Sequence, residues 1–181
     1  MAGRTRLYRL LRDDENPMED GIIAKRPLAD ETPLKHIRHG SQRNSQWIST
    51  SRHLSDVDNF IKLKRRKEGM FTRCRVVEID EQKLQIHVET CRNEMQQILN
   101  IMTKMVGYIP QNIDALLHKF TEQTTGEILD FTDQSVMDTY IPFNPFRPHE
   151  NERARGYARK YSEVLVERFI PADCCIYIYN R

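Results

Sequence analysis

Three short strand-like segments, at the start, in the middle and near the end of the chain, each carry polar side chains at a defined place. They are Leu7-Tyr8-Arg9, Trp47-Ile48-Ser49-Thr50-Ser51 and Ser162-Glu163-Val164-Leu165-Val166. Their aromatic and β-branched residues are typical of strands that are at least half buried. A cation, a cluster of hydroxyls and a carboxylate therefore follow one another on three strands, and the fold has to accommodate strands at both ends and in the middle of the chain.

Length and composition are those of one folded domain. The chain has 181 residues, of which 39% are hydrophobic and 30% charged. This apolar content is sufficient for a packed core and argues against global disorder. The 28 basic and 26 acidic residues give a formal charge of +2, a balance that neither indicates nor excludes a nucleic-acid partner. We interpret residues 1–181 as a single domain.

Cysteine usage and the N-terminal sequence suggest a compartment. Of the four cysteines, Cys174 and Cys175 are adjacent, a spacing that rarely suits a mutual disulfide, and no Cys-x-x-Cys pair occurs. The N-terminus lacks an apolar stretch of signal-peptide length, and no window approaches a membrane span. We therefore expect a soluble, cytoplasmic protein without a membrane partner, although delivery by a specialised secretion route would leave no such mark.

Helix signals separate the strand-like segments. Thr32 and Pro33 are suited to the N-cap and the first position of a helix. Ser55 is the expected N-cap of a second helix that continues to about residue 67 and ends at Gly69. Apolar residues at helical spacing predict a helix over 81–105. Further helices are predicted over 111–121 and, as a polar helix, over 149–161. The three prolines of residues 141–148 predict a loop.

Further strands are predicted over residues 5–11, 46–50, 71–79, 126–132, 162–169 and 174–179. Many short strands at irregular distances, with helices between some of them, do not make a regularly alternating doubly wound sheet. The pattern predicts a mixed α+β domain.

Each polar segment has a structural interpretation beside a functional one. Arg9 can grip a diphosphate or a ribose oxygen through its planar guanidinium, or be one surface arginine among several. The hydroxyls of Ser49, Thr50 and Ser51 can bind a ligand or merely bond to local backbone. Glu163 is the sharpest candidate, because a carboxylate at the mouth of a buried strand is rigidly placed and partly desolvated. Such a group can stabilise developing positive charge.

The order of these segments resembles the ADP-ribosyltransferase family of the cholera-toxin-like type. Leu7-Tyr8-Arg9 matches the family's first strand, and Trp47-Ile48-Ser49-Thr50-Ser51 matches its Ser-Thr-Ser strand. Ser162-Glu163 followed by Ile170-Pro171-Ala172-Asp173 resembles the end of these domains, where a catalytic glutamate opens a strand. The resemblance implies a split, mostly antiparallel β core with flanking helices. Residues 81–141 carry no family motif and are interpreted as a helical insertion.

The resemblance also implies a reaction. Members of the family cleave NAD at the nicotinamide–ribose bond and transfer ADP-ribose to an acceptor, with NAD as co-substrate and without a metal. Carried over position by position, Arg9, Ser49 and Glu163 are the catalytic residues. The cofactor-binding positions implied or suggested are Tyr8, Arg9, His39, Ser49, Thr50, Ser51 and Phe60. Tyr8 and Phe60 could stack on the nicotinamide or adenine ring, but the interpretation as core residues is favoured for both.

One position departs from the family pattern. Many arginine-modifying members carry a second Glu two residues before the catalytic one, and another group carries Gln, whereas this chain has Tyr161. Arginine is therefore in doubt as the target. Three alternatives remain: transfer to an unknown protein or nucleic-acid acceptor, hydrolysis of NAD with water as acceptor, and a binding module that shares the fold without turnover.

Two other patterns are weaker. Residues 62–67 hold five basic side chains, which suggest either a nucleic-acid patch or a solvated helix end favoured by the helix dipole. His36, His39 and His53 have no acidic or cysteine partner at a fixed offset. We therefore expect no metal at these histidines.

Overall fold

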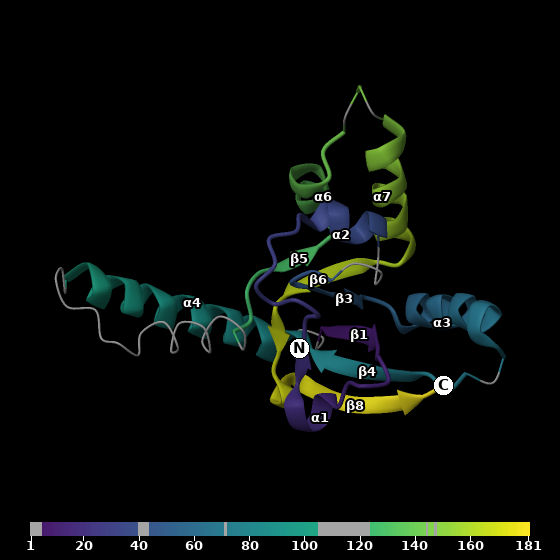
Figure 1. Cartoon of the computed structure of the whole chain (residues 1–181), viewed down its shortest axis with the longest axis horizontal. Helices are drawn as coiled ribbons and strands as arrows, with labels where there is room; N and C mark the ends of the chain where they lie inside the picture. The colour runs from purple at the N-terminus through teal and green to yellow at the C-terminus, as the bar shows by residue number, and fades with distance from the viewer. Residues whose placement is uncertain (1–4, 40–43, 71, 105–123, 144, 147) are drawn as a thin grey trace.

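A six-stranded antiparallel sheet forms the centre of the computed structural model, which describes residues 5–39, 44–70, 72–104, 124–143, 145–146 and 148–181 (Figure 1). The strand order is β5-β6-β3-β1-β4-β8, and every pairing in it is antiparallel. Two short strands, β2 and β7, pair separately. The strands are β1 (Arg6–Leu10), β2 (Ile22–Ile23), β3 (Trp47–Ser51), β4 (Arg75–Asp80), β5 (Ile128–Asp130), β6 (Glu163–Glu167), β7 (Phe169–Ile170) and β8 (Cys175–Asn180).

Helices flank this sheet on several sides. In Figure 1, α2, α6 and α7 gather beside the β5-β6-β3 part, α3 lies at the end of β3, and α4 extends away from the sheet. The helices are α1 (Pro17–Asp20), α2 (Pro33–His39), α3 (Leu54–Glu68), α4 (Glu81–Lys104), α6 (Gln134–Tyr140), α7 (Pro148–Lys160) and the 3-10 helix η2 (Ala172–Cys174). This arrangement confirms the predicted mixed α and β domain with a mostly antiparallel sheet and flanking helices. No helix in the described ranges is both long and apolar enough to cross a membrane.

The sheet is weakly joined at its middle. Strands β1 and β4 pair along Arg6–Leu10, and β3 and β6 pair along Trp47–Ser51, whereas β1 meets β3 only at Tyr8 and Ser51. The sheet therefore consists of two well-paired halves, β5-β6-β3 and β1-β4-β8. Side chains from both halves can approach one another where the pairing between them stops.

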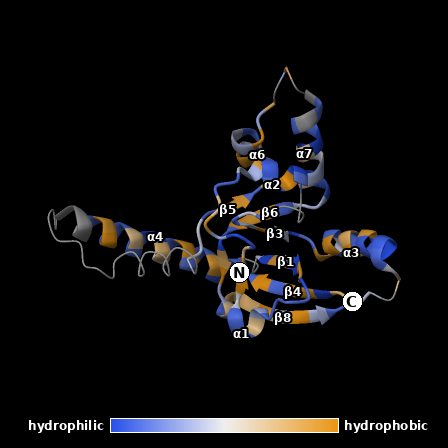
Figure 2. Cartoon of the chain, viewed as in Figure 1, coloured by the Kyte–Doolittle hydropathy of each residue, from blue (hydrophilic) through white to orange (hydrophobic). Residues whose placement is uncertain are grey.

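Three hydrophobic clusters anchor the sheet, and one of them spans both halves. Ile48, Val164 and Val166 pack with Leu7, Val77 and Ile79 in a cluster that spans both halves. A second cluster joins Trp47, Leu165 and Phe131 to α2, α6 and α7, and a third joins Val76 to α3. Figure 2 shows hydrophobic residues along the strands, in agreement with the burial of these side chains. The strands that carry the polar segments are thus fixed from both faces.

Some element boundaries differ from the sequence predictions. Helix α3 begins at Leu54 with His53 at its N-cap, so Ser55 lies inside the first turn and is not the cap. Gly69 does end α3, in a backbone conformation with φ of 116° that suits glycine. Strand β4 begins at Arg75 instead of residue 71. The predicted helix over 111–121 lies outside the described residues.

The segment 81–141 contains more than helix. Strand β5 pairs with β6 at the edge of the sheet, and Leu129, Phe131 and Met137 are buried beneath α6 and α7. The described part of the segment that extends away from the sheet is α4 (Figure 1).

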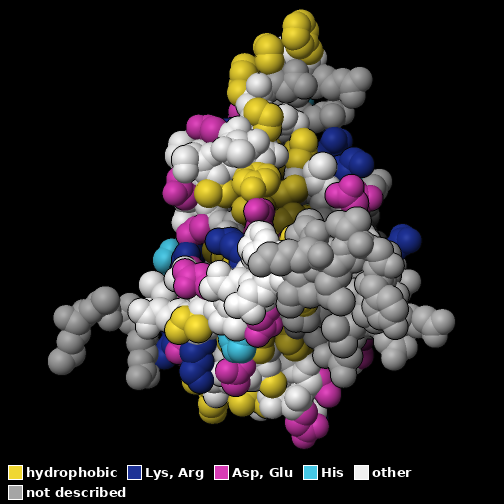
Figure 3. Space-filling view, turned by 90° about the vertical axis from the view of Figure 1, so that its left-hand side faces the viewer, with side chains coloured by type: hydrophobic (Ala, Val, Ile, Leu, Met, Phe, Trp, Pro, Cys, Tyr) yellow, Lys and Arg dark blue, Asp and Glu magenta, His cyan; other side chains and the backbone are white. Residues whose placement is uncertain are grey.

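The loop between α6 and α7 carries exposed aromatic side chains. Phe143 is 63% exposed and Phe146 is 93% exposed. They lie at the tip of the α6–α7 hairpin, where Figure 3 shows hydrophobic side chains at the top of the molecule. Of this predicted loop, Ile141 is buried in the second hydrophobic cluster, whereas the two phenylalanine side chains do not contribute to the core.

Candidate active site

Arg9 lies on β1 where the pairing with β3 has stopped, and its guanidinium bridges the two halves of the sheet. Nη1 donates to the backbone carbonyl of Ser49 at 2.8 Å, and Nη2 bonds Oε1 of Glu15 at 2.9 Å. Nε is buried and has no hydrogen-bond partner among the residues that the structure describes. Arg9 is therefore firmly placed, and one of its buried donors is left unsatisfied by the described residues.

Glu15, the anchor of Arg9, is itself held by a tight turn. Its side chain is buried and also accepts from the backbone N–H of Arg12 at 2.7 Å. Arg75 on β4 donates to the carbonyls of Arg12, Asp13 and Glu15 and so fixes the turn from below. A buried carboxylate held in this way orients the arginine with little residual freedom.

His36 connects α2 to the Ser-Thr-Ser strand. Nδ1 lies 2.6 Å from Oγ of Ser45, and Nε2 lies 3.0 Å from Oγ of Ser49. Burial, together with the nearby positive charges of Arg9 and Lys25, lowers the pKa of His36 to about 4. The ring is therefore neutral at pH 7, with one nitrogen donating and the other accepting.

Glu163 opens β6 directly after a strained turn. Ser162 has φ of 44°, in the left-handed region that non-glycine residues rarely adopt. The turn is clamped because Ser51 Oγ donates to the carbonyl of Tyr161 at 2.7 Å and Ser162 Oγ donates to Asp56 at 2.8 Å. The backbone N–H of Arg52 donates to the carbonyl of Ser162 at 3.0 Å. The position of Glu163 is therefore imposed by three neighbouring contacts.

The carboxyl group of Glu163 is in an environment that disfavours its charge. Burial raises its pKa to about 7, while a hydrogen bond from Ser49 and the positive charge of Arg9 act in the opposite direction. Since the bond from Ser49 stabilises the ionised form, the Ser49 hydroxyl donates to the carboxylate. Near neutral pH this group exists in both protonation states.

One assignment of donors and acceptors satisfies the hydrogen bonds that join Ser45, His36, Ser49 and Glu163. Ser45 Oγ accepts from the backbone N–H of Trp47 at 3.3 Å and can donate to Nδ1 of His36. Nε2 of His36 then carries the proton and donates to Ser49, whose hydroxyl donates to Glu163. The neutral histidine thus fixes the serine hydroxyl toward the carboxylate.

Not every expected site residue joins this group. Thr50 Oγ1 is buried and donates to the carbonyl of Val164 at 2.7 Å, and Ser51 Oγ is taken by the turn before Glu163. Tyr8 packs against the hydrophobic cluster beneath α3. His39 is exposed at the end of α2, and no contact among the described residues connects it to Arg9, Ser49 or Glu163.

Phe60 lies at the edge of the site. Its ring, 44% exposed on α3, meets the ring of Tyr161 edge-on with centroids 5.8 Å apart. Nζ of Lys160 also lies over the Tyr161 ring, 5.3 Å from its centroid. Two residues before Glu163, the chain therefore presents the aromatic ring of Tyr161 and not a carboxylate.

Two members of the group are absent from the sequence-based set. His36 was considered only as a metal ligand, and Glu15 was not among the candidate residues. The spacing of six residues between Arg9 and Glu15 could have suggested their pairing, because a short turn can return the chain to the strand that it left. No sequence signal distinguishes His36 from His39, since both lie on one helix and only the fold orients them.

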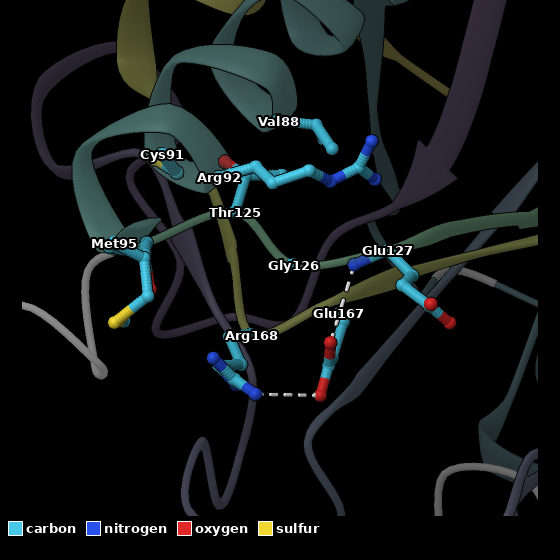
Figure 4. A pocket seen from close by; sticks show the side chains of 10 residues that line it. Val88, Cys91, Arg92, Met95, Thr125, Gly126, Glu127, Glu167 and Arg168 are labelled. Atoms are coloured by element: carbon cyan, nitrogen blue, oxygen red, sulfur yellow. Dashed lines mark hydrogen bonds and ion pairs between the residues drawn. The ribbon is translucent and has the colours of Figure 1, made fainter. Parts of the chain in front are cut away.

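A separate cavity lies at the far end of β6. It has a volume of about 210 Å³ and is lined by residues of α4, the segment 124–127 and the end of β6 (Figure 4). Glu167 and Arg168 form an ion pair at its rim, with an N–O distance of 3.0 Å. Glu167 is the last residue of β6 and Glu163 the first, so this cavity is distinct from the group around Arg9.

Comparisons with known proteins give a fold relationship. No family model matches the chain, and no curated protein sequence matches it significantly. Among solved structures, the protein named EcPltA is similar, with a TM-score of 0.51 and 15% sequence identity. The match covers 99% of this chain and 77% of EcPltA. At this identity the similarity concerns the fold alone.

Proposed function

We propose that this chain is an NAD-dependent mono-ADP-ribosyltransferase of the cholera-toxin-like type. The observation that carries the proposal is the convergence of Arg9, Ser49 and Glu163, from three strands distant in sequence, on one hydrogen-bonded and electrostatically coupled group. These three residues hold the positions that the sequence resemblance assigns to catalysis. We further assign the weak junction between β1 and β3 as the split of an ADP-ribosyltransferase-like sheet.

The donors present fit a dinucleotide diphosphate. The guanidinium of Arg9 keeps Nε without a partner among the described residues, and a buried donor of this kind is costly unless a ligand or water satisfies it. Arg9, Ser49 and Glu163 are all partly exposed, so a substrate can reach them. In this proposal Arg9 holds the phosphate and ribose region of NAD, and its two other contacts keep it aligned.

Glu163 supplies charge stabilisation. Cleavage breaks the bond between ribose C1′ and the nicotinamide nitrogen, and the electron pair leaves with the ring, which becomes neutral. Positive charge develops on the ribose, and an ionised carboxylate beside it lowers the barrier, as in glycoside hydrolysis. The carboxylate also accepts a hydrogen bond from the ribose 2′-hydroxyl. The cationic ring of NAD itself favours the ionised form of Glu163 when it binds.

His36 and Ser49 position this carboxylate. A neutral His36 donates to Ser49, and Ser49 in turn donates to Glu163, so the carboxylate cannot rotate freely. Holding a reacting group in place before substrate arrives removes part of the entropic cost of the reaction. Since His36 stays neutral at pH 7, it adds no charge that would oppose the ribosyl cation.

The acceptor is expected to differ from arginine. Tyr161 occupies the position at which arginine-modifying members carry a carboxylate, and its ring contacts both Phe60 and Lys160. We infer an unidentified protein or nucleic-acid acceptor, and hydrolysis to free ADP-ribose is the alternative.

Nicotinamide release from NAD by the purified protein, with cell lysate as acceptor source, tests the proposal. Glu163→Gln should reduce release by about a hundredfold or more, because it removes the charge without changing shape. Glu167→Gln at the other end of the same strand is the matched control and should retain activity.

Three results separate the candidate functions. Labelled ADP-ribose that appears on a macromolecule identifies a transferase, and free ADP-ribose alone identifies a glycohydrolase. Absence of release from the wild-type protein with lysate present would refute both and leave a binding module on this fold. Release that survives in Glu163→Gln would refute the assigned role of Glu163.

A further inference from the structure

His87, Asp173 and Cys174 form a second cluster of chemically reactive groups, and none of the three belongs to the candidate active site. Nε2 of His87 lies 3.2 Å from Oδ2 of Asp173, and the possible ligand atoms of all three residues lie within 4.8 Å of one another. It is the one group of three such residues found in the part of the chain that the structure describes. The three residues join α4 to η2, segments separated by 86 positions in sequence.

The frame that holds this cluster is rigid. Helix α4 begins directly after β4, and η2 directly precedes β8, and these two strands pair with each other. Lys83, one helical turn before His87, donates from Nζ to the backbone carbonyl of Asp173 at 3.1 Å. The three side chains are thus brought together by backbone elements that are fixed independently of them.

The residue types suit a small tetrahedral cation. Thiolate, imidazole and carboxylate are the three ligand classes of protein-bound zinc, and the combination of soft sulfur with nitrogen disfavours calcium and magnesium. At Zn–N and Zn–O distances of about 2.0–2.2 Å, a tetrahedral edge is about 3.3 Å. The observed separation of 3.2 Å between His87 and Asp173 is close to this edge.

The exposure of the three side chains indicates the side from which a cation would reach them. Asp173 is exposed, His87 is partly exposed, and the sulfur of Cys174 lies beneath them in the hydrophobic core. Figure 3 shows histidine, acidic and basic side chains close together on this face of the molecule. An ion pair accounts for the contact of His87 with Asp173, and core packing accounts for the burial of Cys174; a shared cation would engage all three residues.

We propose that His87, Asp173 and Cys174 bind one Zn²⁺, with a water molecule at the fourth position. The cation fastens the base of α4 to the turn before β8. This site is structural, because it joins two elements at the edge of the sheet, and it is independent of the proposed NAD chemistry.

Metal content and cobalt spectroscopy of the full chain test the site. Purified reduced protein supplied with Zn²⁺ should retain about one equivalent after gel filtration. Co²⁺ in its place should produce a sulfur-to-cobalt charge-transfer band in the near ultraviolet. Cys174→Ser should abolish this band, and Asp173→Asn should lower zinc affinity at least about tenfold.

Matched thiol controls make the test specific. Cys175→Ser alters the adjacent buried thiol, and Cys91→Ser alters a thiol farther along α4, so both should keep the cobalt band. Asp173→Asn changes an exposed side chain and leaves the core intact, so it reports on the site even where Cys174→Ser fails to fold.

The outcomes are decisive in both directions. In the wild type, Zn²⁺ should raise the thermal unfolding midpoint, and in Asp173→Asn the increase should be lost. Retention of much less than one equivalent, or a cobalt band that persists in Cys174→Ser, would overturn the proposal. If Cys175→Ser lost the band to the same extent, Cys174 would not be the specific sulfur ligand, and the proposal would be overturned as well.

Discussion

Two arginines beside the Ser-Thr-Ser strand show how similar residue types serve different ends. Arg52, just after β3, uses all three of its nitrogens. Nε and Nη2 bond Asp130 at 2.9 and 2.6 Å, and Nη1 and Nη2 both bond Glu81. Arg9 has contacts to Ser49 and Glu15 but keeps Nε without a partner among the described residues. The network of Arg52 is closed, whereas the group around Arg9 is open.

The carboxylates of the two regions differ in the same way. Glu81 is buried in a direct ion pair, and its bond to Arg52 is the largest cause of a raised arginine pKa. No ion pair of the described residues involves Glu163, whose pKa is raised to about 7 by burial. A closed network stabilises the fold and has no remaining capacity to bind a ligand. An open group reduces stability and keeps that capacity, which is the usual condition of a functional site.

The largest expected effect comes from opening the closed network. Glu81→Gln removes a buried charge and leaves Arg52 with Asp130 alone, and we expect a loss of about 3 kcal/mol in the free energy of unfolding. This corresponds to a decrease of about 6–12 °C in the unfolding midpoint for a domain of this size. Thermal and urea unfolding at pH 7 measure it. Glu89→Gln, exposed on α4, is the control and should change little.

A loss below about 1 kcal/mol would place the Arg52 network among ordinary surface ion pairs. The contrast between the closed network and the open group would then disappear.

Glu163→Gln is expected to increase the free energy of unfolding, whereas Glu81→Gln is expected to decrease it. The pKa of Glu163 is raised from 4.5 to about 7 on folding, so its effect is absent below pH 4.5 and stability is lost as pH rises to 7. Removing the carboxyl should therefore stabilise the protein by about 2–3 kcal/mol at pH 8. Chemical unfolding of both proteins between pH 4 and 8 should show the difference closing toward acid. A variant no more stable than wild type at pH 8 contradicts the expected burial.

The fold class was accessible from sequence because its signals are local. Alternating β-branched and aromatic residues identified the strands around Ser49 and Glu163, and Pro33 identified the start of α2. The boundary errors have local causes too. His53 takes the N-cap of α3 through its extended backbone, without a side-chain bond, and so carries no cap signal in sequence. Strand order was beyond reach, because pairing between segments as distant as β3 and β6 depends on packing of the whole chain.

The site was accessible only in part, for a related reason. Arg9, Ser49 and Glu163 could be selected because each stands on a recognisable strand. The buried His36 and Glu15 could not be selected from the sequence, because their roles depend on how α2 and the turn after β1 are oriented toward the sheet. Thr50 and Ser51 show the reverse case: the same motif contributes one hydroxyl to the group and commits the other two to backbone carbonyls.

His36 allows the open group to be examined from its other end. Its pKa is lowered from 6.5 to about 4 on folding, so its contribution to stability is complete above pH 6.5 and is lost as pH falls toward 4. Glu163 has the opposite dependence over nearly the same range, and the two effects oppose each other in the wild type. Relative to His36→Gln, the wild type should lose about 2 kcal/mol between pH 6.5 and 4.5. If the free energies of unfolding of the two proteins changed equally with pH over this range, the result would contradict a buried, neutral His36.

The smallest effect should distinguish the hydroxyl of Ser49 from that of Ser51. If the proposed reaction needs ionised Glu163, NAD cleavage should rise with pH through about 7. Ser49→Ala removes the hydrogen bond that favours the ionised carboxylate, so the rising limb should move to higher pH. With half of the wild-type carboxyl ionised at pH 7, the loss of a bond worth about 1 kcal/mol predicts a decrease of about threefold in rate at that pH, recovered in part at higher pH.

Ser51→Ala is the matched control, since its hydroxyl bonds the Tyr161 carbonyl and leaves the electrostatics of Glu163 unchanged. It should retain the wild-type midpoint of the pH profile even where its rate falls. The midpoint, more than the rate, reports whether a hydroxyl acts on the carboxylate, because a general loss of structure lowers activity at every pH. Equal displacement of the midpoint in both variants would mean that the strand as a whole, and not the donor at Ser49, sets the ionisation of Glu163.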